Sequence, residues 1–307
     1  MLGEYYFRLS DFDEEKLDNE IDIIAIGHMG CCRALPDYNE ILEVYNTCKK
    51  HNKKLRLYTP RVPQEHLKFM MEYLQAISML FESDFFQLVI NDIGLLFWMK
   101  EKDYKPKQLI LGATYSWSAM QNSLYDNIIR DEKEDIKRMY AQVNNNNDIR
   151  LSFLKDLNIT EIEVPNIKGV LEQVDRIRDN GFAISVFKTF ILAGFSRSCV
   201  HCKIKKIKAS NCNKECEEVF KLDMNQMWDY LTGSFPYFVD KPEINAYYSS
   251  LFVHGNMQYR ELKNSIKGDE DQLNLMKDTI IKCSGLDKLE KDYEYENKMS
   301  GQFIKSS

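Results

Sequence analysis

The sequence predicts an α/β fold in which parallel strands close into a TIM-like (β/α) barrel, and three observations lead to that prediction. Short β-branched or aliphatic runs alternate with amphipathic segments from the N-terminus to about residue 190. A strand, helix, strand succession predicts a parallel sheet with right-handed crossovers. Seven such runs, with a candidate for an eighth, suit a closed or slightly irregular barrel better than an open sheet.

The expected strands share short apolar runs bounded by turn residues or a polar break. They lie at residues 4–8, 22–27, 55–59, 87–91, 108–112, 161–164 and 183–187, and the eighth candidate lies at 237–240. The segments between them are expected to be helices. The helix expected over residues 37–50 is the best defined, because Asp37 can cap its first free amides and Glu40 completes a capping box.

A change of composition divides the chain near residue 262. Residues 1–262 are expected to form the barrel domain that carries the functional site. Residues 263–307 are highly charged, with KLEKDYEYENK near their end, and predict a helical extension with a frayed tail. The expected organisation is therefore one large α/β domain followed by a C-terminal helical extension.

Charge and hydropathy exclude some functional classes. The net charge is 41 minus 47, or −6, which argues against general DNA binding because such binding depends on many cationic contacts. A basic stretch at residues 203–208 could meet an anionic substrate, or it could be a solvated loop. No apolar run reaches the roughly 18 residues of a membrane helix, and the acidic start lacks the pattern of a signal peptide. We therefore expect a cytoplasmic protein without membrane association.

The cysteines carry the strongest chemical signal. The chain has eight cysteines, and in a cytosolic protein metal chemistry explains them better than disulfides do. Four of them fall in the segment CVHCKIKKIKASNCNKEC, which begins at Cys199 and ends at Cys216. Taken alone, this segment offers four thiolates for either a structural zinc site or an iron-sulfur cluster. Cys48 and Cys283 stand apart and are expected to be inert thiols.

A wider cysteine pattern favours iron. The spacing of Cys199, Cys212 and Cys216, together with Cys31 after the sequence GHMG, resembles the four-cysteine cluster pattern of the collagenase-like (U-thirty-two type) peptidase superfamily. Within that superfamily the chain is most similar to the anaerobic ubiquinone-biosynthesis hydroxylase pair, especially its V-type subunit. The resemblance covers most of residues 4–260 and includes the segments GHMGCC and NDIG and a late GN pair.

The resemblance implies one 4Fe-4S cluster in a barrel domain, held by Cys31, Cys199, Cys212 and Cys216. Cys32 could replace Cys31 after a shift of one residue, and Cys202, which is additional to the family pattern, could compete as a ligand. His201 could also replace a cysteine. The choice among these ligands stays open from the sequence.

The resemblance also implies several activities. Some members of the superfamily were first described as proteases, whereas others hydroxylate ubiquinone precursors or RNA without oxygen, with prephenate implicated as the oxygen source in some. We favour oxygen-independent hydroxylation of a small molecule or RNA, because the cysteine spacing belongs to that branch and no HExxH or Ser/His/Asp protease pattern is present. The V-type subunit works with a homologous partner, which implies a heterodimer. A peptidase of the same superfamily is the first alternative, and a non-catalytic zinc- or cluster-stabilised binding module is the second.

Further candidates lie in loops that follow expected strands, where barrel enzymes carry their chemistry. His28 and Asp92 are the candidate acid/base groups, although a packed loop histidine and a helix cap are the competing interpretations. Arg33 and Arg61 could bind a carboxylate of an anionic substrate, or could form surface ion pairs.

Overall fold

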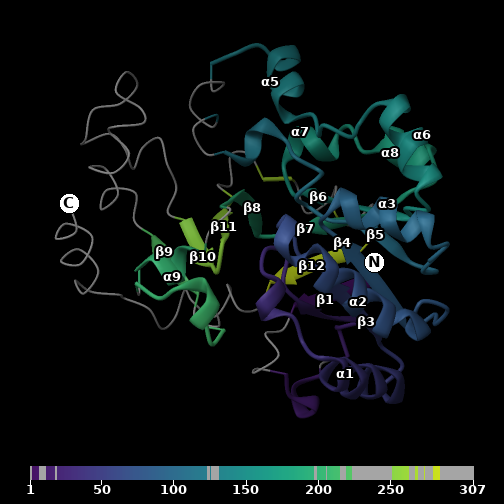
Figure 1. Cartoon of the computed structure of the whole chain (residues 1–307). Coiled ribbons are helices and arrows are strands. Elements are labelled where there is room, and N and C mark those ends of the chain that lie inside the picture. Colours follow the sequence, from purple (N-terminus) through teal and green to yellow (C-terminus); the bar gives the residue numbers. More distant parts are fainter. Residues whose placement is uncertain are drawn as a thin grey trace.

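The computed structural model is an eight-stranded parallel barrel with helices around it and a small antiparallel sheet beside it (Figure 1). It describes residues 2–6, 12–17, 19–122, 125, 131–196, 199–204, 206–214, 219–222, 251–262, 267–268, 273 and 279–283. The strand order around the barrel is β1-β12-β7-β6-β5-β4-β3-β2. The predicted TIM-like barrel is therefore confirmed.

Seven of the barrel strands coincide with the predicted ones to within a few residues. They are β1 (Leu2–Tyr6), β2 (Ile23–Gly27), β3 (Lys54–Tyr58), β4 (Phe86–Ile90), β5 (Leu109–Leu111), β6 (Glu161–Pro165) and β7 (Ala183–Phe187). Each pairs in parallel with its neighbours, from β2 against β3 through to β6 against β7. Almost every residue of β2, β3, β4 and β6 is buried, as expected for strands covered on both faces.

The eighth strand lies outside the expected barrel segment. It is β12 (Thr279–Cys283), which pairs in parallel with both β1 and β7 and closes the barrel. The candidate at residues 237–240 falls outside the described residues. The barrel thus continues past residue 262, into a segment whose high charge predicted a helical extension, because closing the sheet between β1 and β7 buries Ile280 and Ile281.

Helices cover the outside of the barrel. They are α1 (Tyr38–Lys50), α2 (Leu67–Ala76), α3 (Ile93–Glu101), α5 (Glu134–Ala141), α6 (Asp148–Asp156), α7 (Lys168–Leu171) and α8 (Asp175–Asp179) (Figure 1). The capping box expected at the start of α1 is present: Asp37 Oδ1 accepts from the Glu40 amide at 2.9 Å, and Glu40 Oε2 accepts from the Asp37 amide at 2.6 Å. No helix in the described part of the chain is long and apolar enough to cross a membrane.

A second sheet is inserted in the sequence between the barrel strands β7 and β12, and it was not anticipated from the sequence. Its antiparallel strands occur in the order β8 (Phe190–Phe195), β11 (Met257–Glu261), β10 (Leu251–His254) and β9 (Phe220–Leu222). The short helix α9 (Val200–Ile204) lies beside it and carries part of the cysteine segment (Figure 1). This sheet therefore places the late cysteines relative to the barrel.

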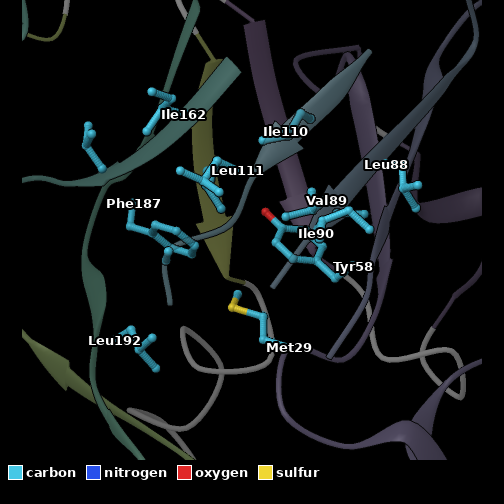
Figure 2. Close-up of a cluster of buried hydrophobic side chains, with 14 of the residues drawn as sticks. Met29, Tyr58, Leu88, Val89, Ile90, Ile110, Leu111, Ile162, Phe187 and Leu192 are labelled. Carbon is cyan, nitrogen blue, oxygen red and sulfur yellow. The ribbon is translucent and has the colours of Figure 1, made fainter. Parts of the chain in front are cut away.

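The hydrophobic core reaches the loops at one end of the barrel. Figure 2 shows Tyr58 among the side chains of β4 and β5, with Met29 and Phe187 at the edge of the same cluster. Met29 is 5% exposed and lies in the loop after β2, so the apolar core continues directly into the loops that carry the candidate site.

Candidate functional site

The loops after β2, β3 and β4 form one connected layer at the carboxyl end of the barrel. The Arg61 amide, after β3, donates to the Met29 carbonyl oxygen, after β2, at 2.9 Å. The Val62 amide donates to Asp92 Oδ2, after β4, at 3.0 Å. Because parallel strands end at the same edge, these loops meet in space, as the sequence predicted. Their hydrogen bonds hold the candidate side chains on a common surface.

His28 is enclosed by its own loop. Its Nδ1 accepts hydrogen bonds from the amides of Gly30, at 2.9 Å, and Cys31, at 3.0 Å. An accepting Nδ1 places the proton of the neutral ring on Nε2, and Nε2 has no hydrogen-bond partner among the described residues. Burial, with a smaller contribution from nearby His201, lowers the pKa of His28 to about 4. At neutral pH His28 is therefore uncharged and offers one N–H.

The hairpin turn between β10 and β11 holds the early loop against the late segment. Asn256 Nδ2 donates to the Gly30 carbonyl at 2.6 Å and to the Ser196 carbonyl at 3.2 Å. The Ser196 amide returns a 2.9 Å bond to the Asn256 carbonyl. A Cβ at Gly30 would lie 2.1 Å from Asn256 Oδ1 and 2.5 Å from the Met257 sulfur, so the contact needs glycine. The GN pair noted in the sequence is thus the link between the two halves of the site.

Replacing Asn256 with alanine is expected to lower the free energy of unfolding by about 1–3 kcal/mol, because the Gly30 and Ser196 carbonyls lose a shared donor. The effect is measured by urea unfolding. Asn39→Ala, on the exposed face of α1, is the control and is expected to change stability by less than about 0.5 kcal/mol. Equal effects of the two substitutions would show that the turn does not hold the site together.

The structure brings cysteines from both ends of the sequence together. The thiol of Cys31 is close enough to Cys199 and Cys212 for their charges to affect its pKa, which burial raises most and these two neighbours raise further. Cys202 lies among the same thiols and forms side-chain hydrogen bonds with Cys199 and Cys212; burial and these neighbours raise its pKa to about 12. Cys216, the fourth expected ligand, lies outside the described residues.

Cys31 and Cys32 point to different surroundings. Cys32 lies in the short 3₁₀ helix Cys32–Ala34, is 6% exposed and belongs to the hydrophobic core. Burial raises its pKa to about 12, and the charged groups near it are Cys31, Asp92 and Glu65 rather than the late cysteines. Of the adjacent pair, Cys31 is therefore the one that faces Cys199 and Cys212.

Two more histidines, His201 and His254, lie near His28. The rings of His28 and His254 lie with their centroids 4.5 Å apart, and His201 is near enough to affect the pKa of His28. All three are buried, with exposed fractions of 2% for His28, 3% for His201 and 8% for His254. The late segment thus contributes imidazoles as well as thiols to the surface around the β2 loop.

Arg33 and Arg61 are both exposed near this surface. Arg33 Nη1 donates to the Ser210 carbonyl at 3.1 Å and so joins the early loop to the cysteine segment. The Arg61 guanidinium lies 4.7 Å from the centre of the Phe195 ring, a cation–π contact that fixes it against β8. Both guanidiniums keep donors for an anion, because these contacts use only part of their capacity.

Asp92 caps α3. Its Oδ1 accepts from the Leu95 amide at 3.1 Å, and its Oδ2 accepts from the Val62 amide at 3.0 Å. Both oxygens therefore already have a structural role, which is the competing interpretation given for this residue from the sequence.

The donor set suits a soft metal group. Thiolates are the preferred ligands of iron-sulfur clusters and of zinc, and the described thiols of Cys31, Cys199, Cys202 and Cys212 gather in one place. In the described part of the chain, no group of three or more His, Cys, Asp or Glu side chains is arranged to hold a single metal ion. The residues therefore fit a thiolate-held group in kind, and Cys216 completes the expected set in sequence only.

Sequence reasoning missed His254 and the polar interior of the barrel. His254 directly precedes the GN pair, so its position beside the turn was the available signal. In the interior, Arg56 and Tyr58 of β3 meet Glu161 and Glu163 of β6. Their spacing of two residues puts each pair on one face of its strand, but such spacing does not say whether that face is inside or outside the barrel.

Comparisons with known proteins gave one structural likeness. No family model matches the chain, and no curated protein matches it. Among solved structures, the chain is similar to that of the U32 peptidase Mk0906, with 13% sequence identity and a TM-score of 0.39, covering 70% of this chain and 83% of that one. A likeness of this size says nothing about activity.

Proposed function

We propose that this chain is an iron-sulfur protein of the collagenase-like peptidase superfamily. It holds one 4Fe-4S cluster through Cys31, Cys199, Cys212 and Cys216, and serves oxygen-independent hydroxylation of a small molecule or RNA. The observation that carries the proposal is the closeness of Cys31 to Cys199 and Cys212. A shared thiolate-held group accounts for the approach of thiols that are so distant in sequence.

The surrounding residues suit such a role. A cluster ligated by four thiolates supplies one-electron transfer. His28 presents its Nε2–H from a buried position and can donate a hydrogen bond to a thiolate or to substrate. Arg33 and Arg61 can hold a carboxylate or phosphate at the edge of the site. Asp92 orients the β3 loop, and an acid/base role for it requires that substrate displace one of its amide donors.

Ligand choice follows the same geometry. Cys31 is preferred to Cys32, which is embedded in the core. Cys202 hydrogen-bonds to two of the proposed ligands and is the thiol best placed to replace one of them. The proposal includes a homologous partner subunit. In a pair of such subunits, one polypeptide can hold the cluster while the other provides the substrate pocket.

Anaerobically purified protein is expected to be brown and to contain about four iron and four sulfide per chain. Cys199→Ala is expected to lose most of both, because a cluster needs every thiolate. Cys48→Ala is the matched control: Cys48 is buried in α1, and among the described residues the charged group that acts on its thiol is Lys53. The measurements are metal and sulfide analysis and the visible spectrum.

A colourless protein with about one zinc per chain would overturn the cluster and leave a zinc-stabilised binding module. Cleavage of an unstructured peptide that survives Cys199→Ala would instead support the peptidase alternative.

A further inference from the structure

The interior of the barrel contains a group of charged side chains sealed from water, separate from the cysteine site. Glu4, Arg56 and Glu163 are each fully buried, and Tyr58 is buried with them. Arg56 Nη1 lies 2.7 Å from Glu4 Oε2, and its Nη2 lies 2.9 Å from Glu161 Oε1. One guanidinium thus shares the barrel interior with the carboxyl groups of Glu4, Glu161 and Glu163 and pairs with the first two, so the group has a net negative charge if all three are ionised.

The hydrogen bonds of Tyr58 require an additional proton. The Tyr58 hydroxyl lies 2.8 Å from Glu4 Oε1 and 2.5 Å from Glu163 Oε1. A tyrosine hydroxyl has one hydrogen to donate, and an ionised carboxylate has none. Tyr58 can therefore donate a hydrogen bond in only one of the two contacts. The other needs a hydrogen that comes from a protonated carboxyl group.

The partners of the two carboxyl groups identify which one is protonated. Glu4 Oε2 faces the Arg56 guanidinium, which favours the ionised form of Glu4. Glu163 Oε2 accepts a 2.8 Å hydrogen bond from the Ala113 amide, which leaves Oε1 as the oxygen that can carry a proton. In the described part of the chain, no ion pair to Glu163 is found. The proton therefore belongs on Glu163 Oε1.

We propose that the barrel interior is a proton-binding site, in which Glu163 is an un-ionised carboxylic acid at neutral pH that donates to Tyr58, while Tyr58 donates to the Glu4 carboxylate. The hydrogen bonds then run from Glu163 Oε1–H to Tyr58 Oη and from Tyr58 Oη–H to Glu4 Oε1, while Glu4 Oε2 keeps its ion pair with Arg56 Nη1. Glu163 also accepts a hydrogen bond from the Ala113 amide, just after β5. This series of hydrogen bonds therefore connects the middle of the barrel to the loop layer at its carboxyl end.

The electrostatics agree with this arrangement. Burial is the largest influence on both carboxyl groups and raises the pKa of Glu163 to about 8 and that of Glu4 to about 7. Among the described side chains, the charged or titratable groups that act on Glu163 are Glu4 from β1 and Tyr58 and Arg56 from β3; Glu161, on its own strand, acts on Glu4. The described residues of β2, β4, β5 and β7 face the group with apolar or uncharged side chains.

The sign of the pH dependence follows from the raised pKa. Between about pH 4.5 and pH 8, Glu163 is protonated in the folded protein and ionised in the unfolded chain, so unfolding releases a proton and stability falls as pH rises. Glutamine at position 163 mimics the un-ionised acid, because its amide can donate to Tyr58 and its oxygen can accept from Ala113. It removes the proton without removing these bonds.

The test compares urea unfolding of the wild type and Glu163→Gln from pH 5 to pH 9. The unfolding equilibrium constant of the wild type, divided by that of Glu163→Gln, is expected to rise by up to tenfold per pH unit up to about pH 8. Above that pH the ratio should level off. The glutamine amide has a second hydrogen that the acid lacks. Any free-energy cost of burying that hydrogen is the same at every pH, so it leaves the slope of the ratio against pH unchanged. Glu101→Gln, on the exposed end of α3, controls for loss of a surface carboxyl group. A flat ratio would overturn the proposal.

Two further measurements separate Glu163 from Glu4. Glu4→Gln is expected to be less stable than Glu163→Gln at pH 7, since it removes the partner of Arg56; the reverse order would place the proton on Glu4 instead. Infrared spectra of the folded wild type at pH 7 are expected to contain the carbonyl band of an un-ionised carboxyl group, and this band should be absent from Glu163→Gln and present in Glu101→Gln. Absence of the band from the wild type would also overturn the proposal.

Discussion

Arg56→Met is expected to lower the free energy of unfolding by about 3–5 kcal/mol at pH 7, which is a large part of the stability of an ordinary protein. Arg56 is fully buried, and its guanidinium donates to Gln87 Oε1 at 2.7 Å and to Ser185 Oγ at 2.8 Å, besides its contacts with Glu4 and Glu161. Burial alone would lower the pKa of Arg56, but Glu161 and Glu4 outweigh it and raise the pKa above its ordinary value. Methionine fills similar space and leaves these carboxylates without a cation.

The loss should be smaller at low pH. Without Arg56, both carboxyl groups become neutral more readily, and protonation removes the uncompensated charge that causes the instability. Urea unfolding at pH 5 and pH 7 measures this difference. Arg138→Met is the control, because Arg138 is 65% exposed and its ion pair with Glu172 lies at the surface; it should cost less than about 0.5 kcal/mol. A loss below about 1 kcal/mol for Arg56→Met would show that water or other groups compensate the buried charge.

Local patterns were enough to predict most of the barrel. The first seven strands combine β-branched runs with turn residues at their ends, and both signals act over a few residues. β12 escaped prediction because its apolar run is short and lies in a charged stretch, where composition favours surface helices. Its place is decided by the unpaired edges of β1 and β7, which closure of the barrel brings together. The pairing of β12 therefore depends on strands that are distant in sequence, and a pattern that spans a few residues does not contain it.

The candidate site also has features that local patterns predict and features that they do not. The positions of His28, Arg61 and Asp92 after strands followed from the alternation of strands and helices, so the loop layer was predictable. The approach of Cys31 to Cys199 depends instead on the β8–β11 sheet and on the Asn256 contact with Gly30, neither of which has a local signal. Only the resemblance in cysteine spacing suggested it. The choice between Cys31 and Cys32 needed the structure, because adjacent residues differ only in which way they point.

That choice leads to the second large effect: Cys31→Ala is expected to abolish the cluster, whereas Cys32→Ala is expected to retain it. Cys31 is half-buried and faces Cys199 and Cys212, so its loss removes a thiolate that no other residue of the early loop can supply. Cys32 packs into the core, and removing its sulfur should cost about 1 kcal/mol of stability while leaving iron and sulfide at the wild-type level.

The measurement is iron and sulfide per chain after anaerobic purification, with circular dichroism to establish that both variants are folded. Cys202→Ala extends the comparison, since Cys202 contacts two proposed ligands; retention of the cluster in this variant is the expected result. Loss of iron from Cys32→Ala with retention in Cys31→Ala would reverse the assignment. Retention in both variants would mean that the cluster is held by the late cysteines alone, and the early loop would then approach them for reasons of packing.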